Sequence, residues 1–374
     1  MLFYLSMNSS SEQKYILVSS ELLKKFMIAA LVKIGVPKKD ALICADVTLE
    51  ASKRGIDSHG IERFKSFYYD RVREGIQQAE TNFEIVKQGP TTAVIDGHNG
   101  MGQVIATKAM NLAIKKAKKY GMGMTVVRNS THYGIAGYYT GLAAQNDMIG
   151  ISGTNTRPAV APTNGVENML GTNPLAFGMP TDETFPFTMD AATSLAQRGK
   201  IELYAKLGKK IPSDWVIDNQ GKMLTDPNEA LDGLIKGKAA LTPMGGVDGH
   251  KGYGYATVVE ILSAALQQGS YLKMLTGIDN GKKVPYRIGH FFIAIDISAF
   301  IEPQLFKKTT GNILRSLRAS KKIPGKKRIY TAGEKEYVTW LERNEKGIPI
   351  NRVLQNELLT IRNEQTLTQF IFPF

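Results

Sequence analysis

The chain has 374 residues, of which 43% are hydrophobic and 22% charged, as expected for a protein with a large buried core. No apolar run approaches the ~18 residues that a membrane-spanning helix needs, and the opening MLFYLSM is too short for a secretory signal. We therefore expect a cytoplasmic protein with no membrane partner. The single cysteine, Cys44, excludes an internal disulfide and a cysteine-rich zinc cluster, and we expect it in the core.

The net charge of +13 needs an explanation, because basic chains can bind nucleic acid. The excess lies mainly in the last third, without aromatic interleaving, zinc-finger spacing or an RNP-like pattern. We expect a solvated basic face, with attraction of anionic small molecules as the second interpretation and nucleic acid a distant third. The basic residues that contribute notably to this excess are Lys307, Lys308, Arg315, Arg318, Lys321, Lys322, Lys326, Lys327 and Arg328.

The first 83 residues are predicted to form a small orthogonal helical domain. Apolar spacing indicates helices over about 20–34 and 37–54, each followed by a glycine. A third helix is expected from residue 57 or 58 to residue 75.

From residue 84 to residue 300, short β-rich runs alternate with glycine-rich loops and helices, which indicates a mixed sheet. The predicted strands are FEIVKQG paired with TTAVIDG, then MTVVRN, MIGISGTNT, FPFTMDAA and GHFFIAID. Helices are expected over 102–120, within THYGIAGYYTGLAAQND and over 252–266. The chain returns to helices at 303–319, 334–346 and 351–365. We predict an α+β fold in three parts, 1–83, 84–300 and 301–374.

The usual dinucleotide fingerprint, G-x-G-x-x-G after a first strand, is absent. GHNGMG has its glycines in another order, and GYG at 252–254 is equally weak. If this chain binds a dinucleotide, it does so without the Rossmann motif.

The histidines indicate a site. Three of the five lie in glycine-rich loops, namely His59, His132 and His250. A single loop histidine is as often a surface turn residue, but three together favour a functional site. None has the H-x-x-x-H or H-x-x-E-H spacing of a zinc site, so we predict no metal.

The segment SHGIERF combines a histidine with an arginine four residues later. If a helix begins at residue 57 or 58, His59 and Arg63 share one face of its first turns. Arg63 could then hold a substrate carboxylate, aided by the helix N-terminus, while His59 exchanges a proton with the adjacent oxygen. The alternative is a surface arginine beside a solvated histidine. Ser58 and His59 are neighbours on a helix, so they do not form a nucleophile–base pair by default.

The chain resembles the malate/L-lactate dehydrogenases of the sulfolactate dehydrogenase-like type, which are unrelated to the Rossmann enzymes. The resemblance covers nearly the whole chain and continues into GEKE and EKGIPIN. Its motifs are SHGIERF, DGHNGMGQ, RNSTHYGIAGYY, GTNPLAFGMPT, MDAATSLAQRGKIE, LTPMGGVDGHKGYG and GHFFIAID.

The resemblance implies roles for single residues. His59 matches the proton donor with Ser58 as a helper, His132 joins them as a catalytic candidate, and Arg63 and Thr172 match substrate contacts. The implied cofactor contacts are His132, Tyr133, Gly134, Ile135, Ala136, Asp190, Ala191, Ala192, His250, Lys251, Gly333 and Glu334. The family usually has proline before this last glycine, whereas this chain has Ala332.

The resemblance further implies a β-rich, non-Rossmann domain that binds NAD or NADP, C-terminal helices packed on the helical domain, and a homodimer. The expected substrate is a small 2-hydroxy or 2-oxo acid, with malate first and lactate or sulfolactate as alternatives. The competing hypothesis is a catalytically silent module that binds anions or nucleic acid through its positive charge.

Overall fold

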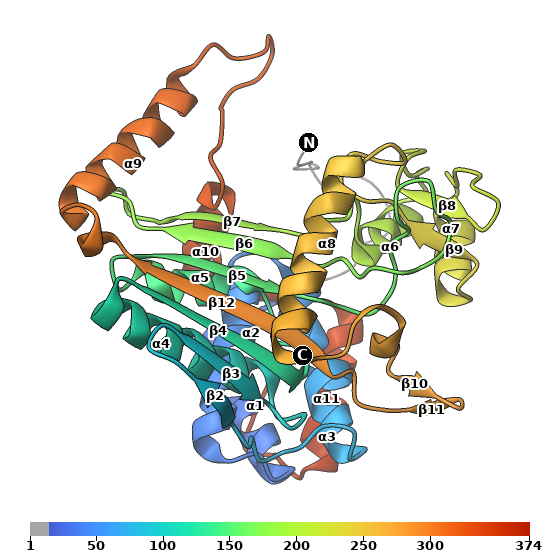
Figure 1. Cartoon of the computed structure of the whole chain (residues 1–374). Coiled ribbons are helices and arrows are strands. Elements are labelled where there is room, and N and C mark those ends of the chain that lie inside the picture. The colour runs from blue at the N-terminus through green and yellow to red at the C-terminus, as the bar shows by residue number, and fades with distance from the viewer. Residues whose placement is uncertain (1–14) are drawn as a thin grey trace.

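The structure, a computed structural model, describes residues 15–374, so the opening MLFYLSM, in which we expect no secretory signal, lies outside it. Figure 1 shows a mixed α/β chain with a central sheet, covering helices, a smaller lobe and one projecting helix. No helix within residues 15–374 is long and apolar enough to cross a membrane.

The central sheet has seven strands in the order β2-β3-β4-β12-β5-β6-β7. Among them β3 and β4 are parallel, and every other neighbouring pair is antiparallel. All the strands predicted from sequence are present, and β6 is additional. The strands are β2 (Glu84–Gln88), β3 (Thr92–Asp96), β4 (Met122–Ser130), β5 (Met148–Thr154), β6 (Leu175–Met179), β7 (Phe187–Ala191) and β12 (Ile288–Asp296).

Helices cover both faces of this sheet because its central strand is apolar on both sides. Phe292 faces α4 (Gly102–Tyr120) and α5 (Ala136–Ala144), whereas its neighbour Phe291 faces α8 (His250–Ala264). Figure 1 shows α8 on the side of the sheet away from α4 and α5. The three helices confirm those predicted for this part of the chain.

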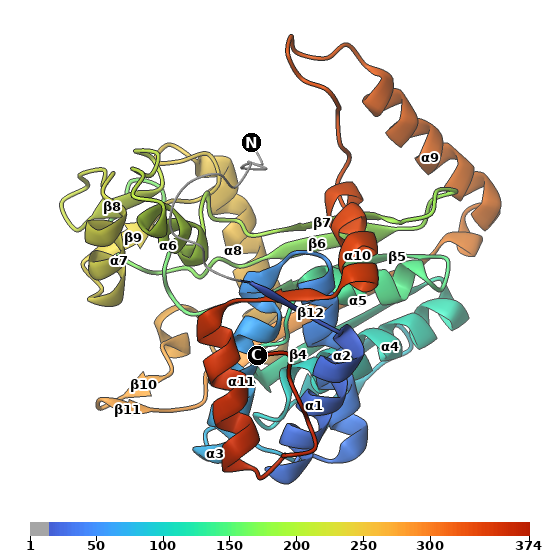
Figure 2. The same cartoon turned by 180° about the vertical axis from the view of Figure 1, so that it is seen from behind.

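Helices from both ends of the chain share one hydrophobic cluster, which includes Leu23, Phe64 and Ile361. Figure 2 shows α11 beside the first helices. The expected helices over 20–34 and 37–54 are confirmed, and Cys44 is buried as predicted. The elements are α1 (Ser20–Lys33), α2 (Lys38–Lys53), α3 (Asp70–Arg73), α11 (Arg352–Glu364), and β1 (Ile16–Val18) paired with β13 (Ile348–Ile350).

The last residues fold back onto α1. The ring of Phe26 lies 5.5 Å from that of Phe370 and 5.1 Å from that of Phe372, both edge to face. Phe372 is 5% exposed, whereas its neighbour Ile371 is 80% exposed. The C-terminal tail therefore completes the cluster that α1 and α11 share.

The single helix expected from residue 57 or 58 to residue 75 is wrong. The segment forms two 3-10 turns, Asp57–His59 and Ile61–Arg63, then a π-helix, Phe64–Tyr69, and then α3. Gly60 interrupts the expected helix. It lies so close to α2 that a Cβ would meet the Ser52 Oγ at 2.2 Å.

A smaller lobe is a feature that the sequence did not indicate. Its core surrounds Trp215 and Ile201 and is separate from the clusters of the sheet. A hairpin of β10 and β11 also escaped prediction. The elements are α6 (Arg198–Lys206), β8 (Val216–Asp218), α7 (Pro227–Ile235), β9 (Ala239–Leu241), β10 (Ile278–Asp279) and β11 (Lys282–Lys283), and the remaining 3-10 turns are Ala265–Gln267, Leu272–Leu275 and Ile297–Ala299.

Two further helices lie between β12 and β13, and both match the predicted bounds. They are α9 (Pro303–Ala319), which projects from the body in Figure 1, and α10 (Glu334–Lys346). Several basic residues here form ion pairs, among them Lys307 with Asp147 and Arg315 with Asp182. Part of the positive charge is therefore compensated locally.

Candidate active site

The two 3-10 turns place Ser58, His59 and Arg63 together. Their position is fixed by α2, because the Ile61 N–H donates to the Ser52 Oγ at 2.9 Å. Arg63 Nε donates to the Ser58 carbonyl oxygen at 2.7 Å. His59 and Arg63 therefore meet across a turn and not along one helical face. Because no α-helix begins at residue 57 or 58, the expected attraction of a substrate anion by a helix N-terminus does not apply.

His132 joins this group from the loop between β4 and α5. Its ring stacks on that of His59, with centroids 5.6 Å apart and planes 25° apart. The Nδ1 atom of His132 lies 2.7 Å from the Tyr68 hydroxyl and accepts the Gly134 N–H at 3.3 Å. Because a backbone N–H can only donate, Nδ1 is the acceptor, and the neutral ring carries its proton on Nε2.

Both histidines are uncharged near neutral pH. Burial, and then the charge of Arg63, lowers the pKa of His59 to about 4. Burial comes first, and then the proximity of His59 and Arg63, among the causes that hold the pKa of His132 well below its ordinary value. Ser58 Oγ lies 3.0 Å from His59 Nδ1, so the serine can hold this ring in place. Two neutral imidazoles beside a cation can accept or donate a proton at a bound oxygen.

Arg63 carries the free positive charge of this group. Its guanidinium lies 5.2 Å from the ring centroid of Phe67, and within residues 15–374 it has no ion-pair partner. Since Nε is engaged by the Ser58 carbonyl, the two terminal nitrogens are left for a ligand. A planar pair of N–H donors suits a carboxylate.

Thr172 lies on the loop before β6. Its Oγ1 atom is 3.4 Å from Thr156 Oγ1, and its carbonyl accepts the Thr193 N–H at 2.9 Å. The loop after β5 and the loop after β7 therefore meet at Thr172.

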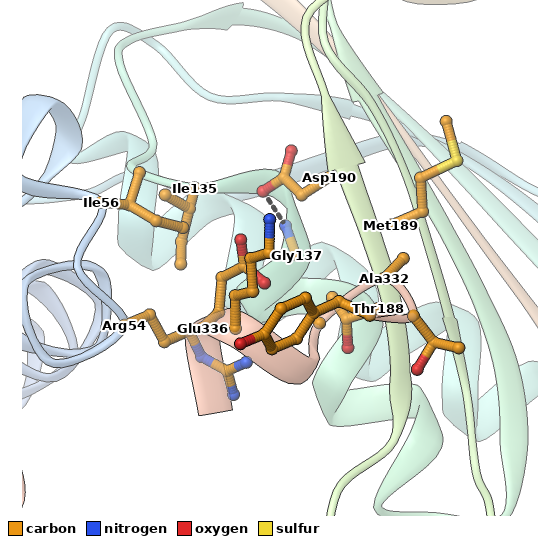
Figure 3. A pocket seen from close by; sticks show the side chains of 13 residues that line it. Arg54, Ile56, Ile135, Gly137, Thr188, Met189, Asp190, Ala332 and Glu336 are labelled. Atoms are coloured by element: carbon orange, nitrogen blue, oxygen red, sulfur yellow. Dashed lines mark hydrogen bonds between the residues drawn. The ribbon is translucent and has the colours of Figure 1, made fainter. Parts of the chain in front are cut away.

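A cavity of about 340 Å³ lies between α2, β7 and the loop before α10 (Figure 3). Three of its lining residues were predicted as cofactor contacts, namely Ile135, Asp190 and Gly333. The others were missed by sequence reasoning: Arg54, Ile56, Gly137, Thr188, Met189, Tyr330, Thr331, Ala332, Lys335 and Glu336.

With Glu336, Asp190 is one of two acidic residues that line this cavity. Its Oδ2 accepts the Gly137 N–H at 2.7 Å, as Figure 3 shows. Burial raises the pKa of Asp190 to about 6, against the opposing effect of the Gly137 hydrogen bond. The carboxylate is therefore ionised only in part at mildly acidic pH.

The cavity wall at Gly333 has no room for a side chain. Gly333 has φ of +85°, and a Cβ would lie 3.0 Å from the Thr188 backbone nitrogen. Ala332, where the family usually has proline, accepts the Thr188 N–H at 3.4 Å, so this hydrogen bond links the loop to β7. The loop is thus held against the strand that carries Asp190.

The other predicted cofactor contacts do not line this cavity. Glu334 is 2% exposed, forms ion pairs with Arg318 and Arg328, and accepts the Thr331 N–H at 3.0 Å. These contacts stabilise the loop before α10 without lining the cavity. His250 and Lys251 are exposed at the start of α8. The remaining residues outside the lining are His132, Tyr133, Gly134, Ala136, Ala191 and Ala192.

Within residues 15–374, no three His, Cys, Asp or Glu side chains are grouped to hold a metal ion. The residues that sequence reasoning missed lie in ordinary-looking contexts. Tyr68 fits an apolar helical pattern, and Arg54 simply ends a helix. Only their place in the fold reveals a link to the site.

Comparison with known proteins gives consistent matches. The sequence model of the malate/L-lactate dehydrogenase family matches residues 18–359. A malate dehydrogenase of Pyrococcus horikoshii is 42% identical over 351 residues, which cover 93% of this chain and 95% of that protein. An L-sulfolactate dehydrogenase of Methanocaldococcus jannaschii is 41% identical over 343 residues, covering 91% and 95%. The crystal structure of malate dehydrogenase from Entamoeba histolytica has a TM-score of 0.92 and 45% identity, covering 96% of this chain and 100% of that one.

Proposed function

The chain belongs to the malate/L-lactate dehydrogenase family, and we propose that it is an NAD(P)-dependent enzyme that interconverts a 2-hydroxy acid and its 2-oxo acid. Malate is the first substrate we propose, with sulfolactate and lactate as the alternatives. The observation that carries this function is the stacked pair of neutral histidines beside the unpaired Arg63.

Each polar residue has a proposed part in this reaction. The terminal nitrogens of Arg63 bind the C1 carboxylate, and Thr172 completes the substrate contacts. His59 takes the proton of the C2 hydroxyl during oxidation and returns it during reduction, while Ser58 holds the ring through Nδ1. His132 donates from Nε2 to the substrate oxygen, because its Nδ1 is already an acceptor.

The cavity around Asp190 fits one part of a dinucleotide. Its volume of about 340 Å³ lies within the ~300–1,000 Å³ of small-molecule sites, and Gly333 packs its loop closely against β7 to form one wall. When bound, NAD or NADP supplies the nicotinamide that exchanges the hydride with C2. We propose that His250, Lys251 and the loop from His132 to Ala136 complete this cofactor site.

We also propose that the cofactor is bound without a Rossmann motif. A sheet with one parallel pair offers no succession of parallel strands at whose ends a dinucleotide would bind. The proposed division is a helical domain to residue 83, a cofactor domain over 84–300, and C-terminal helices that contribute the Gly333 loop. We propose a homodimer, which would cover apolar side chains exposed on α8.

The test is an assay of the purified protein with malate, sulfolactate and lactate, each with NAD and with NADP. We expect reduced nicotinamide to form with at least one pair, read from its absorbance. The absence of turnover with every pair would contradict the proposed function. The alternative of a silent binding module has no supporting observation, since the relatives described above are enzymes.

A further inference from the structure

Two arginines and a tyrosine form a cluster in which both guanidinium groups lie over one ring. Arg157 follows β5, Tyr286 precedes β12, and Arg71 is on α3. The Arg71 guanidinium carbon lies 4.0 Å from the ring centroid of Tyr286, and that of Arg157 lies 5.2 Å from the same centroid. Three segments far apart in the chain therefore bring two positive charges to one aromatic ring.

This positive charge is not compensated by the protein. Within residues 15–374, neither Arg71 nor Arg157 has an ion-pair partner. The acids nearest Arg71 in sequence, Asp70 and Glu74, are paired with Lys65 at 2.8 Å and with Lys283 at 3.0 Å. Two like charges held together without an anion repel each other, so an anionic ligand between or beside them is favoured.

Arg71 is the buried arginine of this cluster. It is only 7% exposed, and its buried Nε has no hydrogen-bond partner. The hydrogen bond from its Nη2 to the Val284 carbonyl oxygen is long, at 3.4 Å. Burial, and then the charge of Arg157, lowers the pKa of Arg71 against the opposing effects of Tyr286 and Glu74. A buried, unpaired guanidinium is costly unless it serves a ligand or holds a neighbour.

The cluster lies within reach of the proposed reaction centre. The charges of Arg63 and Arg157 both act on His132 and lower its pKa, after burial and His59. Thr156, the neighbour of Arg157, has its Oγ1 atom 3.4 Å from that of Thr172. Two free arginines from separate segments, Arg63 and Arg157, thus act on the same imidazole.

We propose that Arg157 binds the second acidic group of the substrate, a carboxylate or sulfonate carried on C3, and that Tyr286 and Arg71 hold Arg157 in position. This inference rests on the proposed function, because it assigns C1 of the same substrate to Arg63. It makes the enzyme selective for dianionic 2-hydroxy acids, and lactate, which has a methyl group at this position, leaves Arg157 unpaired.

The test compares Arg157→Gln and Arg157→Lys with the wild type on malate, sulfolactate and lactate. For Arg157→Gln we expect kcat/KM for both dianions to fall on the order of 10²-fold, mainly through KM, because a charge-assisted contact is lost. Turnover of lactate should change by less than about threefold, since lactate has no group for this arginine. Arg157→Lys should recover part of the loss for malate and sulfolactate.

Binding without turnover gives a second measure. Succinate is a dianion and propionate a monoanion, and neither has a hydroxyl to oxidise. Succinate should inhibit the wild type more strongly than propionate, and Arg157→Gln should remove this difference. Arg352→Gln, at an exposed position on α11, is the matched control and should leave all values unchanged. Thermal unfolding of each variant checks that the fold is intact.

The outcomes separate the inference from the function on which it rests. A wild type inactive on every 2-hydroxy acid would contradict the function. A wild type that uses malate while Arg157→Gln lowers malate and lactate turnover equally would overturn the inference and leave the function standing. Equal wild-type efficiency on lactate and malate would overturn it as well. If sulfolactate alone depends on Arg157, the second group is a sulfonate and the carboxylate assignment is wrong.

Discussion

The ring of His59 stacks on that of His132 with 5.6 Å between centroids. The two residues are far apart in sequence, since His59 precedes α4 and His132 follows it. Their environments differ, because His59 Nδ1 faces a serine hydroxyl and His132 Nδ1 faces a tyrosine hydroxyl and a backbone N–H. This difference supports the different tasks that we propose for them. It also makes their variants separable by experiment.

His59→Ala should lower kcat on the order of 10²-fold or more with little change in KM, because a proton-transfer group is removed. Arg63→Lys should chiefly raise KM for the acid, since the ammonium lacks the planar pair of donors. Steady-state kinetics at saturating cofactor measures both. His98→Ala, at a histidine paired with Glu84 outside the site, is the control. Near-normal turnover in both site variants would leave SHGIERF as a surface turn.

Tyr68→Phe should disturb His132 without touching substrate. It removes the hydroxyl that lies 2.7 Å from Nδ1 and leaves the longer Gly134 hydrogen bond, at 3.3 Å, to keep the proton on Nε2, so this tautomer is less strongly favoured. We expect a loss of ~1 kcal/mol of unfolding free energy and roughly tenfold in kcat. Nitrogen NMR shifts of the histidines would report the tautomer directly. Tyr271→Phe, at a ring 53% exposed, should have neither effect, and an unchanged tautomer in Tyr68→Phe would refute this role.

Stability should rise with pH between about 4 and 6.5 because of His59. Its pKa is lowered to about 4 in the folded chain from an ordinary 6.5, so the unfolded chain binds more protons in this window. His132 and His290 are shifted in the same direction, whereas the raised pKa of Asp190, about 6, acts against them. His59→Gln should therefore flatten the dependence without abolishing it. Parallel curves of Tm against pH for the two proteins would contradict this.

The C-terminal tail should contribute measurably to stability. Phe372→Ala should cost ~3 kcal/mol, because a buried ring packed against Phe26 is lost. Ile371→Ala is the matched control from the adjacent position, where the side chain is 80% exposed and the loss should stay within ~0.5 kcal/mol. Urea unfolding compares the two. Equal losses would show that the tail does not pack as described.

The protein should be a homodimer at micromolar concentration. Val258 and Ile261 on α8 are 49% and 53% exposed, and a second subunit would cover such apolar side chains. Light scattering gives the mass of the wild type and of Ile261→Glu. A monomeric wild type would contradict the prediction, while a dimer that persists in Ile261→Glu would place the interface on another face.

Elements with their own sequence pattern could be predicted. The bounds of α9 and α10 follow from apolar spacing, and the pairing of β2 with β3 follows from two adjacent strand-like runs. The small lobe could not, because its strands β8 and β9 have three residues each and its core forms only when distant segments meet at Trp215. Short elements carry too few periods to be distinguished from loops.

The site shows the same limit. Glycine-rich loops with histidines indicated His59 and His132, but their contact depends on the tertiary path. The prediction that His59 and Arg63 share a helical face was wrong because Gly60 packs against Ser52. The Ser52 hydroxyl also accepts the N–H of Ile61, nine residues later, and no local spacing reveals these contacts. Arg54 and Lys335, which both line the cavity, are about three quarters of the chain apart in sequence. Residues that are far apart in sequence can be recognised as one site only when the fold that brings them together is known.

The position of β12 has a consequence for synthesis. This strand hydrogen-bonds to β4 on one side and β5 on the other, yet it is the last of the seven to leave the ribosome. Until then β2, β3 and β4 form one ribbon and β5, β6 and β7 another, with unpaired edges facing each other. The loop of His132 leads from β4 of the first ribbon to α5, which packs on the strands of the second. A chain interrupted before residue 288 would therefore leave this loop between two unpaired strand edges that can bind to other chains.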